Sequence, residues 1–152
     1  MSCSALRSKR TIGRILAAGF LLFLPVMSDA VAKFPKKRSE WFGTYTADGS
    51  GNAETFNLEI GNQQGTESDK VSVFAMNLAE LRGGWSLSKM GSRFKAVTRA
   101  EGGALAPKMT LDASVIADAT VLQGTYALQR YFKDGNKIVK RPLVTGTFLV
   151  SR

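Results

Sequence analysis

The stretch Gly124-Thr125-Tyr126-Ala127-Leu128-Gln129-Arg130 carries the pattern that decides the fold class. Read with the two-residue period of a β-strand, Gly124, Tyr126 and Leu128 lie on one face, and the small or polar residues between them lie on the other. A mostly apolar face opposite a small, mostly polar one indicates a half-buried strand. The same order of glycine, small residue and aromatic residue begins at three more positions, Gly43, Gly83 and Gly146.

Strand-like segments follow one another at short intervals along the rest of the chain. We expect strands at residues 40–47, 54–60, 70–76, 81–89, 93–100, 108–116, 120–132, 137–141 and 143–152. Glycine-rich and polar turns, such as residues 48–52, separate them. The pattern predicts an all-β fold, an antiparallel meander of eight to nine strands that forms an up-and-down β-barrel or a strongly curled sandwich.

The final predicted strand keeps the inward pattern to its end. Val144, Phe148 and Val150 fall on one face of it, so we expect these side chains to be buried. In a closed barrel this strand would pair with the first strand, around Trp41 and Tyr45.

The Gly-x-aromatic strands of this chain resemble those of the lipocalin and avidin superfamilies. The resemblance covers four short strands and implies a calycin-like barrel. Streptavidin-like proteins bring a cluster of tryptophans to their ligand, whereas residues 33–152 contain only Trp41 and Trp85. No biotin-binding residue is therefore carried over to this chain.

The first 32 residues have the features of a secretory signal peptide. Four cations accompany an apolar stretch at residues 15–27, and Ala30-Val31-Ala32 supplies the small residues that a signal peptidase reads. That stretch is shorter than the roughly 20 residues of a membrane-spanning helix. We expect an exported protein, periplasmic or secreted, with no transmembrane span after cleavage, a basic tail at residues 33–39 and one barrel domain at residues 40–152. An uncleaved N-terminal anchor is the alternative.

The composition of residues 33–152 excludes several classes of chemistry. Cys3 is the only cysteine and the chain has no histidine, so a disulfide framework, serine–histidine or cysteine–histidine catalysis and the common zinc sites lack their residues. No cofactor site is apparent. Paired carboxylates remain, as in glycoside hydrolases, and the candidates are Glu54, Glu59, Asp112 and Asp118. We interpret them as surface acids and expect a protein that is not an enzyme, with a carboxylate-based hydrolase as the most distant alternative.

Positive charge concentrates in two places. Residues 33–152 hold 17 basic and 11 acidic residues, a net charge of +6, and cations cluster at residues 33–38 and 133–141. We expect these clusters to contact a protein, an anionic polymer or a membrane surface of the cell envelope, but not nucleic acid. The predicted contact residues are Lys36, Lys37, Arg38, Tyr131, Lys137, Lys140 and Arg141.

The main alternative is a barrel that binds a small apolar ligand inside. An eight-stranded barrel encloses just enough room for one small molecule, and Trp85, Tyr126 and Phe148 would line it. A filled interior is favoured because large inner residues alternate with glycine and alanine. An empty apolar cavity above roughly 300 Å³ would favour the ligand instead. The sequence does not determine the oligomeric state.

Overall fold

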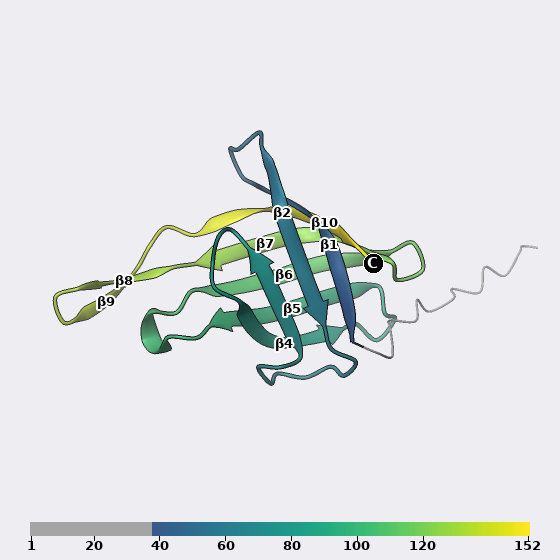
Figure 1. The fold of residues 1–152 in the computed structure, drawn as a ribbon, viewed down its shortest axis with the longest axis horizontal. Coiled ribbons are helices and arrows are strands. Elements are labelled where there is room, and N and C mark those ends of the chain that lie inside the picture. The colour runs from purple at the N-terminus through teal and green to yellow at the C-terminus, as the bar shows by residue number, and fades with distance from the viewer. Residues whose placement is uncertain (1–37) are drawn as a thin grey trace, which may run out of the picture.

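Residues 38–152 are described by a computed structural model, in which they form an all-β structure built on a closed eight-stranded antiparallel barrel (Figure 1). The predicted signal peptide and most of the basic tail lie outside the described residues. The barrel strands are β1 (Ser39–Ala47), β2 (Ala53–Ile60), β3 (Val71–Ala75), β4 (Leu81–Leu87), β5 (Arg93–Ala100), β6 (Lys108–Ile116), β7 (Val121–Gln129) and β10 (Val144–Ser151). A separate two-stranded sheet pairs β8 (Tyr131–Asp134) with β9 (Lys137–Lys140).

The barrel strands are arranged in chain order, and the β8–β9 hairpin is inserted between β7 and β10. Strand β1 closes the barrel by pairing with β10, from Phe42 opposite Ser151 to Ala47 opposite Gly146. Each barrel strand therefore has a neighbour on both sides, which removes the free edges of an open sheet. The predicted meander is confirmed, and its closed form is the barrel rather than the sandwich. The pairing of the last strand with the first is also confirmed.

The predicted strand over residues 120–132 is two strands in the structure. Strand β7 pairs with both β6 and β10 up to its end, and the chain then leaves the barrel as β8, which pairs with β9. The side-chain amide of Gln129 marks this junction, because it donates hydrogen bonds to the backbone oxygens of Arg130 (3.0 Å) and Arg141 (2.8 Å). Pro142 follows on the returning chain and has no N–H to donate to a ladder.

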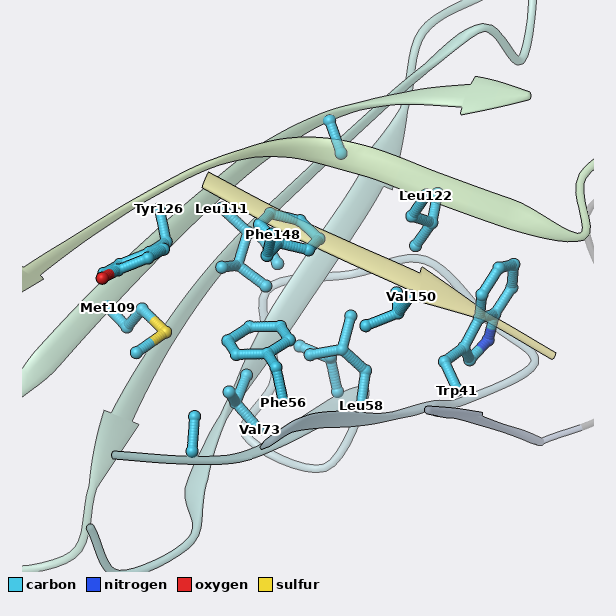
Figure 2. Packing of buried hydrophobic residues seen from close by; sticks show 14 of the residues in the cluster. Trp41, Phe56, Leu58, Val73, Met109, Leu111, Leu122, Tyr126, Phe148 and Val150 are labelled. Atoms are coloured by element: carbon cyan, nitrogen blue, oxygen red, sulfur yellow. The ribbon is translucent and has the colours of Figure 1, made fainter. Parts of the chain in front are cut away.

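Alternate side chains point into the barrel and fill it (Figure 2). The rings of Phe56 and Phe148 stack with their centroids 5.0 Å apart, and those of Trp85 and Phe94 stack at 5.8 Å. Aliphatic side chains such as Leu122 occupy the space between the aromatic rings and are fully buried. A close-packed interior of this kind stabilises the fold mainly by removing apolar surface from water.

Two of the strand glycines lie where neighbouring backbones approach too closely for a side chain. A Cβ atom at Gly43 would lie 1.9 Å from the backbone oxygen of Leu149, and one at Gly83 would lie 1.9 Å from that of Val97. Contacts this short would force the strands apart. The glycine in the repeated sequence pattern is thus a requirement of strand packing in a strongly curved barrel.

One end of the barrel is covered by Arg152. Its guanidinium lies 5.7 Å from the centre of the Trp41 ring, a distance typical of a cation–π contact. Its Nε donates a hydrogen bond of 2.9 Å to the backbone oxygen of Ala119, in a β6–β7 turn where residues 117–119 all have positive φ. Such backbone is unfavourable for alanine and aspartate, so the packing around this turn must hold it in place.

Candidate functional site

The β8–β9 hairpin projects from the barrel as an arm, which we define as residues 131–140 (Figure 1). In the antiparallel register Tyr131 lies opposite Lys140, and Lys133 lies opposite Ile138. Residues directly opposite each other share a face of a hairpin. One face of the arm therefore combines two lysines with a tyrosine and an isoleucine, and it contains no acid.

The other face of the arm carries Phe132, Asp134, Lys137 and Val139. Arg141, just after the arm, places its guanidinium 5.6 Å from the centre of the Phe132 ring. The predicted contact residues are thus divided by the register. Tyr131 and Lys140 lie on the acid-free face, whereas Lys137 and Arg141 lie on the face that includes Asp134.

Apolar side chains on and beside the arm are open to solvent. Phe132 is 39% exposed and Ile138 is 50% exposed. Leu143, in the segment between β9 and β10, is 55% exposed. The sequence pattern drew attention to the cations here, but Lys133 and Ile138 were not among the predicted contact residues. Their role becomes visible only when the register shows that they lie side by side.

Of the predicted contact residues in the basic tail, Arg38 lies within the described residues. Lys36 and Lys37 lie outside the described residues. Arg38 forms an ion pair with Glu59 on β2, and a hydrogen bond to that carboxylate raises the pKa of the Arg38 guanidinium. Part of its charge is therefore balanced within the barrel.

The three aromatic residues considered for an interior ligand are all buried and do not line a common hollow. Trp85 borders a depression under the loop of residues 61–69, and Phe148 borders a shallow one on the outer face of β7 and β10. Tyr126 borders a third, at one end of the barrel. All of these hollows open to the surface, and the barrel interior around Tyr126 and Phe148 is filled by other side chains of the core (Figure 2).

The four candidate carboxylates are distributed over different parts of the barrel. Glu59 faces outward from β2 and Asp112 from β6, which lies on the opposite side of the closed sheet. Asp112 forms ion pairs with Arg93 (2.6 Å) and Lys95 (3.7 Å), and the Arg93 guanidinium lowers the pKa of the Asp112 carboxyl. Asp118 lies in the β6–β7 turn. Within the described residues there is no cluster of acids that could hold a metal ion.

Glu54 differs from the other acids because its strand position faces inward. It lies two residues before the buried Phe56 at the start of β2, where it accepts a hydrogen bond from the Tyr45 hydroxyl. Arg130 has the matching inward position two residues after the buried Leu128. We call this end of the barrel the mouth, and we define it by Tyr45, Glu54, Tyr126 and Arg130, which line one depression of about 350 Å³.

Sequence reasoning missed the mouth as a unit. Extending the inward period by one more step from Phe56 and from Leu128 would have reached Glu54 and Arg130. Their proximity, however, depends on how the barrel closes.

Comparisons of this chain with protein-family models, with curated proteins and with solved structures find no match. In the part of the chain that the structure describes, no helix has the length and apolar character needed to cross a membrane.

Proposed function

We propose that this protein is an exported, non-enzymatic binding module of the cell envelope, and that its β8–β9 arm docks on an anionic lipid surface. The observation that carries the proposal is the acid-free face of the arm, where Lys133 and Lys140 flank the half-exposed Ile138. Export rests on the signal-like features of the first 32 residues.

The mixture of charged and apolar side chains favours a lipid surface over a charged polymer. Lysine and arginine are attracted to anionic headgroups by about 1 kcal/mol each. Apolar and aromatic side chains can then enter the boundary between headgroups and acyl chains, as they do in interfacial amphipathic segments. A polymer such as an acidic polysaccharide would engage the cations but would leave Ile138, on the same face, exposed to water.

The arm is also placed so that the barrel does not obstruct such a contact. It extends beyond the end of β7 and the start of β10, away from the remaining strands (Figure 1). The barrel would remain outside the bilayer as a rigid support. Its inward-facing hydrophobic residues form the core, and exposed ones such as Phe42 and Leu149 lie on its outer face. A few cations and one or two apolar contacts support weak, reversible binding, which depends on salt.

Vesicle sedimentation tests the proposal. The purified protein should bind phosphatidylcholine vesicles that contain phosphatidylglycerol, and added salt should weaken the binding. The double variant Lys133→Glu/Lys140→Glu should bind about 30-fold more weakly or worse, because it removes two contributions of about 1 kcal/mol each. The double variant Lys89→Glu/Arg99→Glu makes the same change in net charge at exposed positions on the barrel, and it should bind nearly as well as the original protein.

The apolar part of the contact has its own test. Ile138→Ser should weaken vesicle binding without changing the charge of the arm. If Ile138→Ser bound vesicles as well as the original protein does, and the original protein also bound dextran sulfate, the lipid proposal would be contradicted and a polymer partner indicated. Equal weakening in both charge variants would mean that net charge, and not the arm, attracts the protein to vesicles.

A further inference from the structure

The mouth of the barrel contains buried polar groups that the described fold leaves without partners. Its depression of about 350 Å³ lies where β1 and β7 end and where β2 and β10 begin. That volume is near the lower end of the range for small-molecule sites. Three of the residues that define the mouth come from β1, β2 and β7, and Arg130 directly follows β7. The side chains deeper in the barrel are apolar.

Arg130 is held in place by its backbone, and its side chain is left unpaired. Its backbone oxygen accepts hydrogen bonds from the Gln129 side chain and from the Arg141 N–H, both at 3.0 Å. Its Nε is buried and has no hydrogen-bond partner among the described residues. A buried donor without an acceptor is energetically unfavourable, so its position favours a ligand that supplies an acceptor.

Tyr126 presents a second donor of this kind. Its side chain is 2% exposed, and its hydroxyl is buried without a described partner. The ring is fixed by an edge-on contact with Tyr45, with centroids 5.6 Å apart. It also lies against Gly146, where a Cβ atom would come within 2.8 Å of the hydroxyl oxygen. The tyrosine hydroxyl is thus held rigidly, with glycine providing the necessary space.

Glu54 supplies the opposite charge at the solvent-exposed rim of the same depression. The Tyr45 hydroxyl donates to one of its carboxylate oxygens, and no other described side chain pairs with it. Glu54 and Arg130 do not form an ion pair with each other. A carboxylate and a guanidinium that line one pocket without pairing are both available to a ligand. The carboxylate can bind a positively charged group of the ligand, and the guanidinium can bind a negatively charged one.

We propose that the mouth binds a small zwitterionic amino-carboxylate, of the size and kind of a free α-amino acid. The ligand carboxylate accepts hydrogen bonds from Tyr126 Oη and from the Arg130 guanidinium, and the ligand ammonium donates to Glu54. Its side chain lies against Met76 and Val144, the apolar part of the same depression.

The charges of the pocket favour a zwitterion over a simple anion. A ligand with only a carboxylate would meet Arg130 but would also be repelled by Glu54 and Asp48, the two acids whose negative charges act on the Tyr126 hydroxyl. A ligand with only an ammonium group would leave the two buried donors without an acceptor. The α-amino acid satisfies both sets of groups and brings no net charge into the site.

Isothermal titration with matched ligands tests this inference independently of the arm. Leucine, phenylalanine, glutamate and lysine are titrated into the purified protein. The best of them is then compared with its analogue lacking the amine and its analogue lacking the carboxylate; for leucine these are 4-methylpentanoate and 3-methylbutylamine. We expect each analogue to bind at least tenfold more weakly than the amino acid. Failure of all four amino acids to bind, or equal binding by either analogue, would overturn the inference.

The variant Tyr126→Phe separates ligand binding from a structural role. Because the hydroxyl has no described partner, its removal should leave the Tm of the free protein unchanged or raise it, while amino-acid binding weakens about tenfold. Glu54→Gln should also weaken binding, and Glu40→Gln, which makes the same change at an exposed acid outside the mouth, should not. A Tyr126→Phe protein with lower Tm and unchanged amino-acid affinity would mean that the hydroxyl serves the fold, and would overturn the inference.

Discussion

Tyr45 illustrates how the position of one residue in the barrel sets its chemistry. Its ring makes edge-on contacts with Phe56 and Tyr126 in the core, while its hydroxyl reaches Glu54 at the mouth. Burial, and then the hydrogen bond to the Glu54 carboxylate, raise the pKa of the Tyr45 hydroxyl to about 12. The same residue thus contributes to packing and keeps its proton in strongly alkaline solution.

This pKa predicts a loss of stability at alkaline pH. An unfolded tyrosine ionises near pH 10, so between pH 10 and 12 the folded chain holds a proton that the unfolded chain has lost. The contribution of Tyr45 should be complete below pH 10 and should fall by up to about 3 kcal/mol as the pH rises to 12. Urea denaturation across this range measures the decline, and Tyr45→Phe should show a smaller one. Equal declines in both proteins would contradict the assignment to Tyr45.

At the scale of elements, the arm is separable from the barrel. Its ladder is formed by β8 and β9 alone, whereas β7 and β10 each pair with two barrel strands. An isolated two-stranded hairpin is marginally stable in water, so the arm contributes little to the stability of the whole. The Arg141 N–H and the Arg130 oxygen form a 3.0 Å hydrogen bond at its base, which fixes the width at which the chain leaves the barrel.

Replacing the arm should therefore leave the barrel folded. We expect that exchange of residues 131–140 for a two-residue Asn-Gly turn changes the free energy of unfolding by about 1 kcal/mol or less. The far-ultraviolet circular dichroism should still be that of a β protein, and binding to anionic vesicles should be lost. An unfolded product would mean that the arm is needed for the barrel to form.

At the scale of the whole molecule, closure of the sheet depends on its last strand. Strand β10 pairs with β1 on one side and with β7 on the other, so it joins the two ends of the meander. It also places Phe148 and Val150 in the core, both almost completely buried, and brings Arg152 over Trp41. Its loss would open the barrel and expose the edges of two strands.

Deletion of residues 147–152 should prevent stable folding. The loss of two buried side chains costs at least about 3–6 kcal/mol, which is comparable with the total stability of a small domain. We expect the truncated chain to show no cooperative thermal transition, or to be degraded on expression. The arm replacement removes a similar number of residues and serves as the matched control. A truncated chain that melts within a few degrees of the intact one would contradict the role of β10 in closure.

The sequence by itself determined the strands and the face that each one buries. Alternation at period two is a local property, and it correctly placed Tyr126, Phe148 and Val150 in the core, because each side chain's face follows from its neighbours along the strand. Val144, also predicted to be buried, is only partly buried because it begins β10 at the open end of the barrel. The pattern of short strands and turns likewise predicted the meander. The sequence showed that Gly43 begins one copy of the repeated pattern. It did not show that a Cβ atom at this position would lie 1.9 Å from the backbone oxygen of Leu149.

Only the tertiary structure decided what lies together across the barrel. Strand β7 ends at Gln129 because the first residue of its neighbour β6, Lys108, lies opposite Gln129. This pairing joins residues far apart in the sequence, so the alternation within residues 120–132 does not predict it. Glu54 and Arg130 are far apart in sequence, and they meet at the mouth because the sheet closes through β1 and β10. Likewise, the register of β8 with β9 decides which cations share a face with Ile138. The local sequence pattern determines the face of the sheet on which a side chain lies, but closure of the barrel and strand register determine which residues it contacts.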